Sequence, residues 1–231
     1  MTSDVVADAQ AAAERAAAII AQDARDAVAA RGRFIMAVSG GHTPWIMLRA
    51  LANEDVPWAG VHVFQVDERV APDGDPDRNL THLHESLLEH APITREQIHA
   101  MPVEVPDLNA AANQYARTLT GIAGAPAVLD LAHLGLGPDG HTASLVPGDP
   151  VLEITDSDVG LTGVYMGRRR MTLTYPILDR SRKILWLITG SEKVPMLARL
   201  RAGDTTIPAG RVSRDQALIL ADRDAAGETQ V

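Results

Sequence analysis

Short apolar runs alternate with helical segments along this chain of 231 residues, and this alternation limits the possible fold more than any other feature. The runs have the length of strands and end at glycines or charged residues. Strands that alternate with helices form parallel sheets with helices on both faces. The sequence therefore predicts a Rossmann-like, mostly parallel α/β fold. We expect one sugar-phosphate-binding catalytic domain over residues 1–231, with no internal repeat and no dividing linker.

The expected elements follow from the spacing of apolar residues. Apolar runs predict strands at 34–38, 61–66, 99–101, 171–174, 183–188 and 217–221, and a buried strand that starts at Leu129. Helical spacing predicts helices at 3–30, 45–52, 79–89, 107–119 and 175–180, a last one ending at Arg201, and a helical turn at 93–98. We expect Ser3 or Asp4 to cap the first helix. Residues 151–168 are expected to form short strands, and the C-terminal tail has the composition of a disordered segment.

Composition excludes several classes of protein. The net charge of −9 argues against a nucleic-acid groove and against an anionic membrane surface. The absence of cysteine excludes disulfides, thiolate metal sites and a cysteine nucleophile. Aromatic residues make up only 3% of the chain, so the core must consist of Ala, Val, Leu and Ile. No signal peptide and no apolar run of membrane-spanning length is visible, and we expect a cytoplasmic protein.

One turn combines three glycines with two chemically active side chains. The apolar run from Leu129 breaks at Gly135, Gly137 and Gly140, and only Gly140 separates Asp139 from His141. Ligands of open α/β sheets bind beyond the carboxyl ends of the strands, where this turn is expected. An imidazole takes up and returns a proton near neutral pH, which suits general acid–base catalysis. On the residues alone, the alternative is a structural histidine.

A second turn has the features of an anion site. The strand predicted at 34–38 ends at Ser39-Gly40-Gly41-His42-Thr43-Pro44, with Thr43 as the expected helix cap and Pro44 in the first turn. Backbone N–H groups and the positive end of a helix bind phosphates in such turns. The alternative is an ordinary strand-to-helix turn without a ligand.

Charged residues gather at the ends of other predicted strands. Asp67-Glu68-Arg69 follows the strand at 61–66, Arg168-Arg169-Arg170 precedes the strand at 171–174, and Lys193 follows the strand at 183–188. A salt-bridged surface turn is the common explanation for such clusters. The other explanation is a clamp for an oxyanion, because the planar guanidinium fork fits phosphate. Together with the glycine turn at 39–41, these cations favour a phosphorylated substrate.

Three other kinds of chemistry fit the residues poorly. Gly135 to Gly140 matches the dinucleotide pattern G-x-G-x-x-G, but Pro147-Gly148 cuts short the helix that must follow. No G-x-S-x-G nucleophile elbow is present. His82 and His84 are two residues apart on a predicted helix, so they point in different directions and do not form a metal site.

Four blocks of the chain, in order, resemble the 6-phosphogluconolactonase family, and together they span most of its length. The third block is long and highly specific. The blocks are Ser39-Gly40-Gly41 with Thr43-Pro44; Asp67-Glu68-Arg69 with Pro72 and Asn79; Gly135 to Gly148 with Gly137, Asp139-Gly140-His141-Thr142-Ala143-Ser144-Leu145 and Pro147; and Arg170 to Thr174 with Gly190 and Lys193.

The resemblance implies hydrolysis of 6-phosphoglucono-δ-lactone in the oxidative pentose phosphate pathway, without a metal or other cofactor. It implies that His141 activates water, while Asp139 orients the imidazole or contacts a sugar hydroxyl. It also implies a fold shared with glucosamine-6-phosphate deaminases and isomerases. The partner would be a small phosphorylated sugar lactone, with no nucleic acid and no membrane, and the enzyme a monomer or weak dimer. The substrate-binding residues would be Ser39, Gly40, Gly41, His42, Thr43, Asp67, Arg69, Asn79, Gly137, Arg170 and Lys193, with Arg168 and Arg169 as uncertain neighbours.

The chain departs from the family pattern at two positions. His42 stands where Ser is usual, and Val146 replaces a common Phe. Sugar-phosphate deaminases and isomerases typically carry Tyr after Asp-Glu and an acidic residue five places after the histidine, where this chain has Arg69 and Val146. Isomerisation needs more acid–base groups than hydrolysis of a strained ester, so the lactonase is favoured. A non-catalytic sugar-phosphate sensor is the third possibility, but it has no need of the Asp139 and His141 pair.

Overall fold

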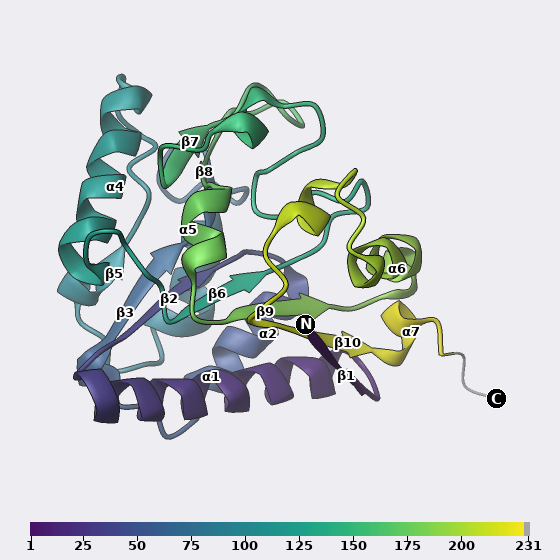
Figure 1. The fold of residues 1–231 in the computed structure, drawn as a ribbon. Helices are drawn as coiled ribbons and strands as arrows, with labels where there is room; N and C mark the ends of the chain where they lie inside the picture. Colours follow the sequence, from purple (N-terminus) through teal and green to yellow (C-terminus); the bar gives the residue numbers. More distant parts are fainter. Residues whose placement is uncertain (229–231) are drawn as a thin grey trace.

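The protein is organised around one seven-stranded sheet in which every pair of neighbours is parallel. The computed structural model describes residues 1–228 (Figure 1). The predicted mostly parallel α/β fold is confirmed. The strand order is β1 (Thr2–Val6), β10 (Ala217–Asp222), β9 (Ile184–Ile188), β6 (Leu131–Leu134), β2 (Phe34–Val38), β3 (Val61–Gln65) and β5 (Ile98–His99).

Helices cover both faces of this sheet. In Figure 1, α1 and α2 lie below it, while α4 and α5 lie above it. No helix within residues 1–228 is both long enough and apolar enough to cross a membrane. The α-helices are α1 (Ala9–Arg31), α2 (His42–Leu51), α3 (Asn79–Leu83), α4 (Leu108–Ala123), α5 (Tyr175–Arg180), α6 (Val194–Ala202) and α7 (Arg223–Ala226). One π-helical segment, η2 (His84–Leu88), continues α3. Short 3₁₀ turns are η1 (Trp58–Gly60), η3 (Arg95–Gln97), η4 (Pro150–Glu153), η5 (Ser191–Lys193) and η6 (Pro208–Arg211).

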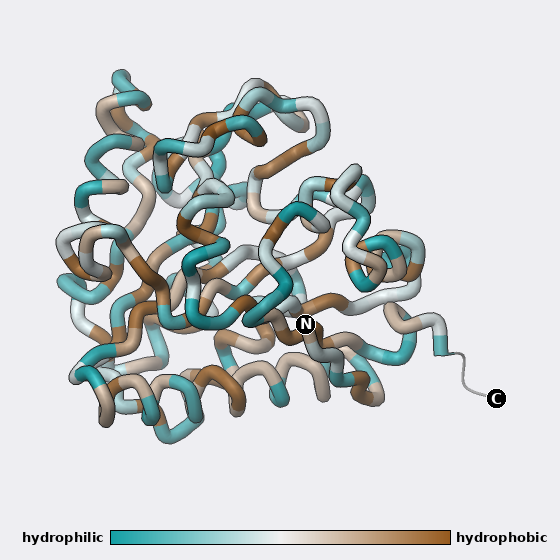
Figure 2. The backbone as a smooth tube through the Cα atoms, in the orientation of Figure 1, coloured by the Kyte–Doolittle hydropathy of each residue, from teal (hydrophilic) through white to brown (hydrophobic). Residues whose placement is uncertain are grey.

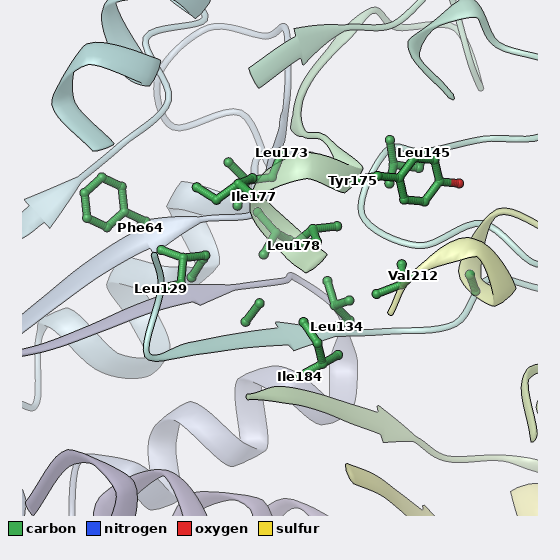
Figure 3. Packing of buried hydrophobic residues seen from close by; sticks show 14 of the residues in the cluster. Phe64, Leu129, Leu134, Leu145, Leu173, Tyr175, Ile177, Leu178, Ile184 and Val212 are labelled. Carbon is green, nitrogen blue, oxygen red and sulfur yellow. The ribbon is translucent and has the colours of Figure 1, made fainter. Parts of the chain in front are cut away.

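Side chains from alternate strand positions build two hydrophobic layers. In β2, Ile35 joins the cluster under α4 and α5, whereas Phe34 and Met36 join the cluster against α1 and α2. Figure 2 shows hydrophobic stretches along the central strands and hydrophilic stretches in peripheral loops. Figure 3 shows the first layer, where Leu134, Ile177 and other aliphatic side chains interdigitate. Alanines of α1 that are fully buried let this helix lie close to the sheet.

A second, smaller sheet stands beside the parallel one and was not predicted. It has three antiparallel strands in the order β4 (Asp67–Arg69), β8 (Arg170–Leu173) and β7 (Val159–Leu161). The expected charged turn at 67–69 is thus a strand. Pairing with β8 supplies the backbone hydrogen bonds that local sequence does not indicate. This sheet carries two arginines into the site described below.

Two further predictions are wrong at the ends of the chain. The helix expected from residue 3 begins at Ala9, and its cap is Asp8, whose carboxylate accepts a hydrogen bond from the Ala11 N–H at 2.8 Å. The residues before it form β1, because β10 offers a free edge to these partly β-branched residues. The tail, expected to be disordered, forms α7. The part of that tail at 229–231 lies outside the described residues.

The second helix also begins earlier than predicted. It starts at His42, with Gly41 rather than Thr43 in the capping position, and no side chain caps it. Gly41 has φ +131°, a conformation that favours glycine. The helical turn expected at 93–98 is confirmed as η3, with a capping box between Thr94 and Gln97.

Candidate active site

The site lies where the strand order of the main sheet reverses. From β2 the chain moves outward to β3 and β5, then returns to β6 on the other side of β2. Such a switch point leaves a crevice at the carboxyl ends of the two central strands. The described residues form a cavity of about 210 Å³ there. Its lining consists of Ser39, Gly40, Asp67, Arg69, Asn79, Gly135, Leu136, Gly137, Pro138, His141, Ala143, Arg170 and Lys193.

His141 and Asp139 form a tight pair at one end of the cavity. The His141 Nδ1 atom lies 2.6 Å from Asp139 Oδ1, and the His141 backbone N–H donates to the same oxygen at 3.1 Å. Burial alone would raise the pKa of Asp139, but these hydrogen bonds and the neighbouring histidine lower it below its usual value. An ionised carboxylate only accepts, so Nδ1 carries the proton and Nε2 keeps a free lone pair.

Gly137 makes room for the His141 imidazole. A Cβ atom at this position would collide with the His141 ring. The Gly137 N–H also donates to the His141 carbonyl at 2.8 Å, which closes the turn. Gly140, with φ +84°, permits the chain to reverse direction between Gly137 and His141. Gly137 and Gly140 therefore serve to position His141.

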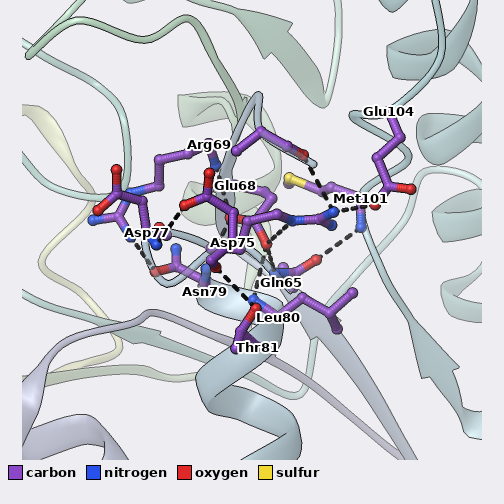
Figure 4. A network of polar contacts seen from close by, with 12 residues as sticks. Gln65, Glu68, Arg69, Asp75, Asp77, Asn79, Leu80, Thr81, Met101 and Glu104 are labelled. Carbon is purple, nitrogen blue, oxygen red and sulfur yellow. Dashed lines mark hydrogen bonds and ion pairs between the residues drawn. The ribbon is translucent and has the colours of Figure 1, made fainter. Parts of the chain in front are cut away.

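Arg69 and Asn79 are held together on another wall of the cavity (Figure 4). The Arg69 guanidinium donates to Asn79 Oδ1 at 2.8 Å and to the Asp77 carbonyl at 2.7 Å. The Asn79 amide donates to the Asp67 carbonyl at 3.0 Å and to its carboxylate at 3.2 Å. Each polar group thus has a fixed direction before any ligand binds.

Glu68 organises this wall from underneath. Its fully buried carboxylate accepts from the backbone N–H groups of Arg69, Asn79 and Leu80 at 2.8–2.9 Å, and from the Gln65 amide at 2.9 Å. Arg78 Nε lies 3.4 Å away and balances its charge. A buried charge that is both paired and fully hydrogen-bonded is tolerated in a protein interior.

Two arginines face each other across the small sheet. Arg69 on β4 and Arg170 on β8 are directly opposite partners, and both line the cavity. Like charges at opposite positions repel, and an anion between them would remove that repulsion. The Nε atoms of both are buried and have no hydrogen-bond partner within the described part of the chain. Burial lowers the pKa of Arg170, and the charge of Asp67 opposes that shift.

Arg170 makes different contacts from its two neighbours, Arg168 and Arg169. Arg168 pairs with Asp75 and Asp77 at 3.0 and 3.1 Å, and the Arg169 Nε donates to the Thr162 carbonyl at 3.3 Å. The sequence could not distinguish the three arginines, and the structure places only Arg170 of them in the cavity lining.

Most of the predicted substrate-binding residues line this cavity, but Gly41, His42 and Thr43 do not. The Thr43 hydroxyl is 2.7 Å from that of Thr189. His42 lies beside Trp45 in a separate surface groove. Gly40 packs against Asn79 so closely that a Cβ atom there would collide with the amide.

Sequence reasoning missed two polar groups near the site. His133 is buried under the turn that follows β2. Its Nδ1 accepts from the Ser39 N–H at 3.3 Å, and its carbonyl accepts from the Ser39 hydroxyl at 3.0 Å. Tyr165 donates to Asp139 Oδ2 at 3.0 Å. No local pattern marks either residue. Among residues 1–228, no three histidine or carboxylate side chains gather in an arrangement that could hold a metal ion.

A family model for glucosamine-6-phosphate isomerases and 6-phosphogluconolactonases matches residues 7–220. The chain belongs to that family. A 6-phosphogluconolactonase from Mycobacterium tuberculosis is 38% identical over 216 residues, which cover 87% of each chain. One from Synechocystis is 36% identical over 203 residues, which cover 86% of this chain and 84% of its relative.

Solved structures of the family have the same fold. The crystal structure of 6-phosphogluconolactonase from Thermotoga maritima is 27% identical, with a TM-score of 0.85 over 96% of this chain and 98% of that one. A monomeric glucosamine-6-phosphate deaminase also has a TM-score of 0.85, at 18% identity. The fold is therefore common to both branches of the family, and the residues of the site must distinguish them.

Proposed function

We propose that this protein hydrolyses 6-phosphoglucono-δ-lactone to 6-phosphogluconate in the oxidative pentose phosphate pathway. The observation that carries the proposal is one cavity with a carboxylate-paired imidazole at one end and two facing guanidinium groups at another. A phosphorylated lactone needs both: cations for its phosphate and a base for its ester carbonyl. The relatives named 6-phosphogluconolactonase at 36–38% identity support the same activity.

His141 acts as the base in this proposal. Its free Nε2 accepts a proton from water as the water oxygen attacks the lactone carbonyl carbon. The charge that develops on the imidazole is stabilised by Asp139, 2.6 Å from Nδ1. The tetrahedral intermediate then collapses, the bond to the ring oxygen breaks, and Nε2–H returns the proton to that oxygen. The products are a hydroxyl and a carboxylic acid, the acid releases its proton to solvent to become the carboxylate, and the histidine is restored.

Asp139 orients the imidazole in this proposal. His141 is part of the cavity lining, whereas the described atoms of Asp139 lie outside it. Two donors of His141, its ring and its backbone N–H, bond to the same oxygen of Asp139. This arrangement fixes the direction of the ring and its tautomer, which general-base catalysis requires.

The phosphate binds at the other walls of the cavity. Arg69 and Arg170 provide paired guanidinium groups, and Lys193 adds a flexible ammonium group from η5. Gly40, in the turn after β2, lets the chain approach closely, and Asn79 and Asp67 face the sugar. Anchoring the phosphate places the lactone carbonyl near His141 and lowers the entropy lost in the reaction.

An assay with freshly prepared 6-phosphogluconolactone tests the proposal. We expect the wild-type protein to exceed the spontaneous rate and His141→Ala to lower kcat by about 10²- to 10⁴-fold, the usual contribution of a general base. His84→Ala, at an exposed position on η2, is the matched control and keeps full activity. A wild-type rate equal to the spontaneous rate would contradict the proposal. Turnover of glucosamine 6-phosphate instead would assign the protein to the deaminase branch.

The setting of the enzyme is part of the same proposal. We place it in the cytoplasm as a single catalytic domain that acts on a small-molecule substrate without metal, nucleic acid or membrane. We expect it to work as a monomer or weak dimer. Sedimentation of the purified protein tests the oligomeric state, and the lactone assay with and without a chelator tests the independence from metal.

A further inference from the structure

Tyr165 stands at the tip of the hairpin between β7 and β8, next to the His141 and Asp139 pair. The two residues after it, Met166 and Gly167, have φ values of +50° and +80°. Positive φ at both central positions is the condition for a tight two-residue hairpin turn. Tyr165 and Arg168 close this turn with backbone hydrogen bonds in both directions, at 2.9 and 3.3 Å.

The hairpin is also fastened to the rest of the molecule. Arg168 makes ion pairs with Asp75 and Asp77, on the loop that precedes α3, at 3.0 and 3.1 Å. The neighbour Met166, by contrast, is 80% exposed and projects away. Tyr165 is therefore held in place from both sides of the turn, whereas Met166 makes no comparable contact.

The Tyr165 side chain bridges the two halves of the site. Its hydroxyl donates to Asp139 Oδ2 at 3.0 Å and lies 3.5 Å from His141 Nδ1. Its ring meets the His141 ring edge-on, with centroids 5.6 Å apart. The Arg170 guanidinium lies 5.0 Å from the centre of the same ring, in the position of a cation–π contact.

We propose that Tyr165 is a positioning residue for the catalytic pair, holding the second oxygen of Asp139 so that the first faces the His141 ring. The inference rests on the proposed lactonase function and deepens it. His141 supplies both donors to Oδ1, so without Tyr165 nothing within the described residues would bond to Oδ2. A carboxylate held at one oxygen only can rotate away from the imidazole.

Tyr165 lies beside the cavity and not in its lining, so we assign it no contact with the substrate. The described residues that line the cavity include His141 and Arg170 but not Tyr165. Burial and the bond to Asp139 raise the pKa of Tyr165, so its hydroxyl stays protonated and remains a donor. Tyr165 thus acts on the reaction through Asp139 and not through the substrate.

Several charged groups face the pair and bear on its pH dependence. Arg170 on β8 touches the Tyr165 ring, while Asp67 and Arg69 on β4 and Lys193 on η5 line the same cavity as His141. Tyr165→Phe changes none of these charges. It removes only the hydrogen bond that holds Asp139 Oδ2. The carboxylate can then rotate away from the imidazole and stabilises the charged imidazolium less.

The test is Tyr165→Phe, compared with Met166→Ala as the matched control on the same turn. We expect Tyr165→Phe to lower kcat about three- to tenfold with KM unchanged, the size of one hydrogen bond. We also expect the acidic limb of the pH profile of kcat/KM to move to lower pH, because a less well held carboxylate stabilises the imidazolium less. Met166→Ala should leave the profile in place. An unchanged profile in Tyr165→Phe, or a rise in KM alone, would overturn the inference.

Two further measurements separate this inference from the proposed function. The proton resonance of His141 Nδ1–H in the free protein should move in Tyr165→Phe and stay fixed in Met166→Ala, whether or not the lactone is hydrolysed. In an Asp139→Asn background, Tyr165→Phe should have no additional effect on kcat, because both changes act on the same carboxylate. Additive losses, or an unmoved resonance, would show that Tyr165 does not work through Asp139.

Discussion

Gly137 shows how one missing side chain can determine the position of another residue. The His141 ring occupies the space that a Cβ atom of Gly137 would fill. Gly135, two residues earlier on the same turn, also lines the cavity, yet its Cβ position has no neighbour within 4 Å. The two glycines therefore form a natural pair for comparison.

Gly137→Ala should displace the His141 ring and reduce kcat at least tenfold, because a misplaced base loses its alignment with the carbonyl. Gly135→Ala, the control, should retain activity within about twofold of the wild type. Steady-state kinetics and thermal melting check both variants. Equal activity of the two variants would contradict the role given to Gly137.

The sequence predicts residues of the site unequally. Asp139 and His141 could be found because they share one glycine turn, and Arg69 because it follows an apolar run. Tyr165 could not be found, since 26 residues separate it from Asp139 and no periodic pattern surrounds it. Only the pairing of β7 with β8 brings it to the site. Whether each predicted side chain contacts the substrate stays a prediction.

Strand β4 consists entirely of charged residues, yet Asp67 and Glu68 are buried. Four N–H donors surround the Glu68 carboxylate, and two of them belong to the backbone at the start of α3. This one side chain therefore joins β4 to α3 and fixes Arg69 and Asn79 together. The Glu68 carboxylate thus connects the small sheet to the wall of the site.

Glu68→Gln should lower the free energy of unfolding by about 3 kcal/mol, because an NH₂ group replaces an oxygen that accepts from buried donors. Arg78, which pairs with both Glu68 and Glu104, allows a control. Glu104→Gln, at the half-exposed partner, should cost less than about 1 kcal/mol. Urea denaturation measures both. Equal losses in the two variants would argue against the special role of Glu68.

The main sheet was predictable where apolar runs coincide with strands, as at Phe34–Val38 and Ile184–Ile188. Strands β1 and β4 were not, because β4 is entirely charged, β1 has only Val5 and Val6 as apolar residues, and neither run has strand periodicity. β1 also precedes an alanine-rich helix, so its residues were assigned to that helix. Both strands exist because a distant strand supplies their hydrogen bonds, and single-sequence patterns do not contain that information.

Acid sensitivity of the whole molecule follows from its buried histidines. Burial lowers the pKa of His133 to about 4, and the Ser39 N–H at its Nδ1 requires the neutral ring. The unfolded chain binds the proton near pH 6.5. Above that pH, His133 therefore does not reduce the free energy of unfolding. As the pH falls from 6.5 to about 4, the unfolded chain binds a proton that the folded protein does not, and the free energy of unfolding decreases. The loss reaches about 3 kcal/mol for one such group.

His133→Leu should flatten this dependence. At pH 7 the variant should be less stable by about 1 kcal/mol, since the Ser39 N–H loses its acceptor. Between pH 7 and pH 4.5 its free energy of unfolding should fall less than that of the wild type. His84→Gln, at an exposed position, should follow the wild-type curve. Denaturant titrations at several pH values measure this, and parallel curves for His133→Leu and wild type would contradict the prediction.

The pairing of β1 with β10 bears on the order in which the molecule is completed. β1 precedes every other described strand along the chain, β10 follows them all, and β1 has no other partner within residues 1–228. During synthesis, β1 leaves the ribosome before every other described strand and stays unpaired until β10 has emerged. The edge of the sheet therefore closes last, and a nascent chain that stops before β10 leaves the backbone groups of two strand edges, β1 and β9, open to neighbouring molecules.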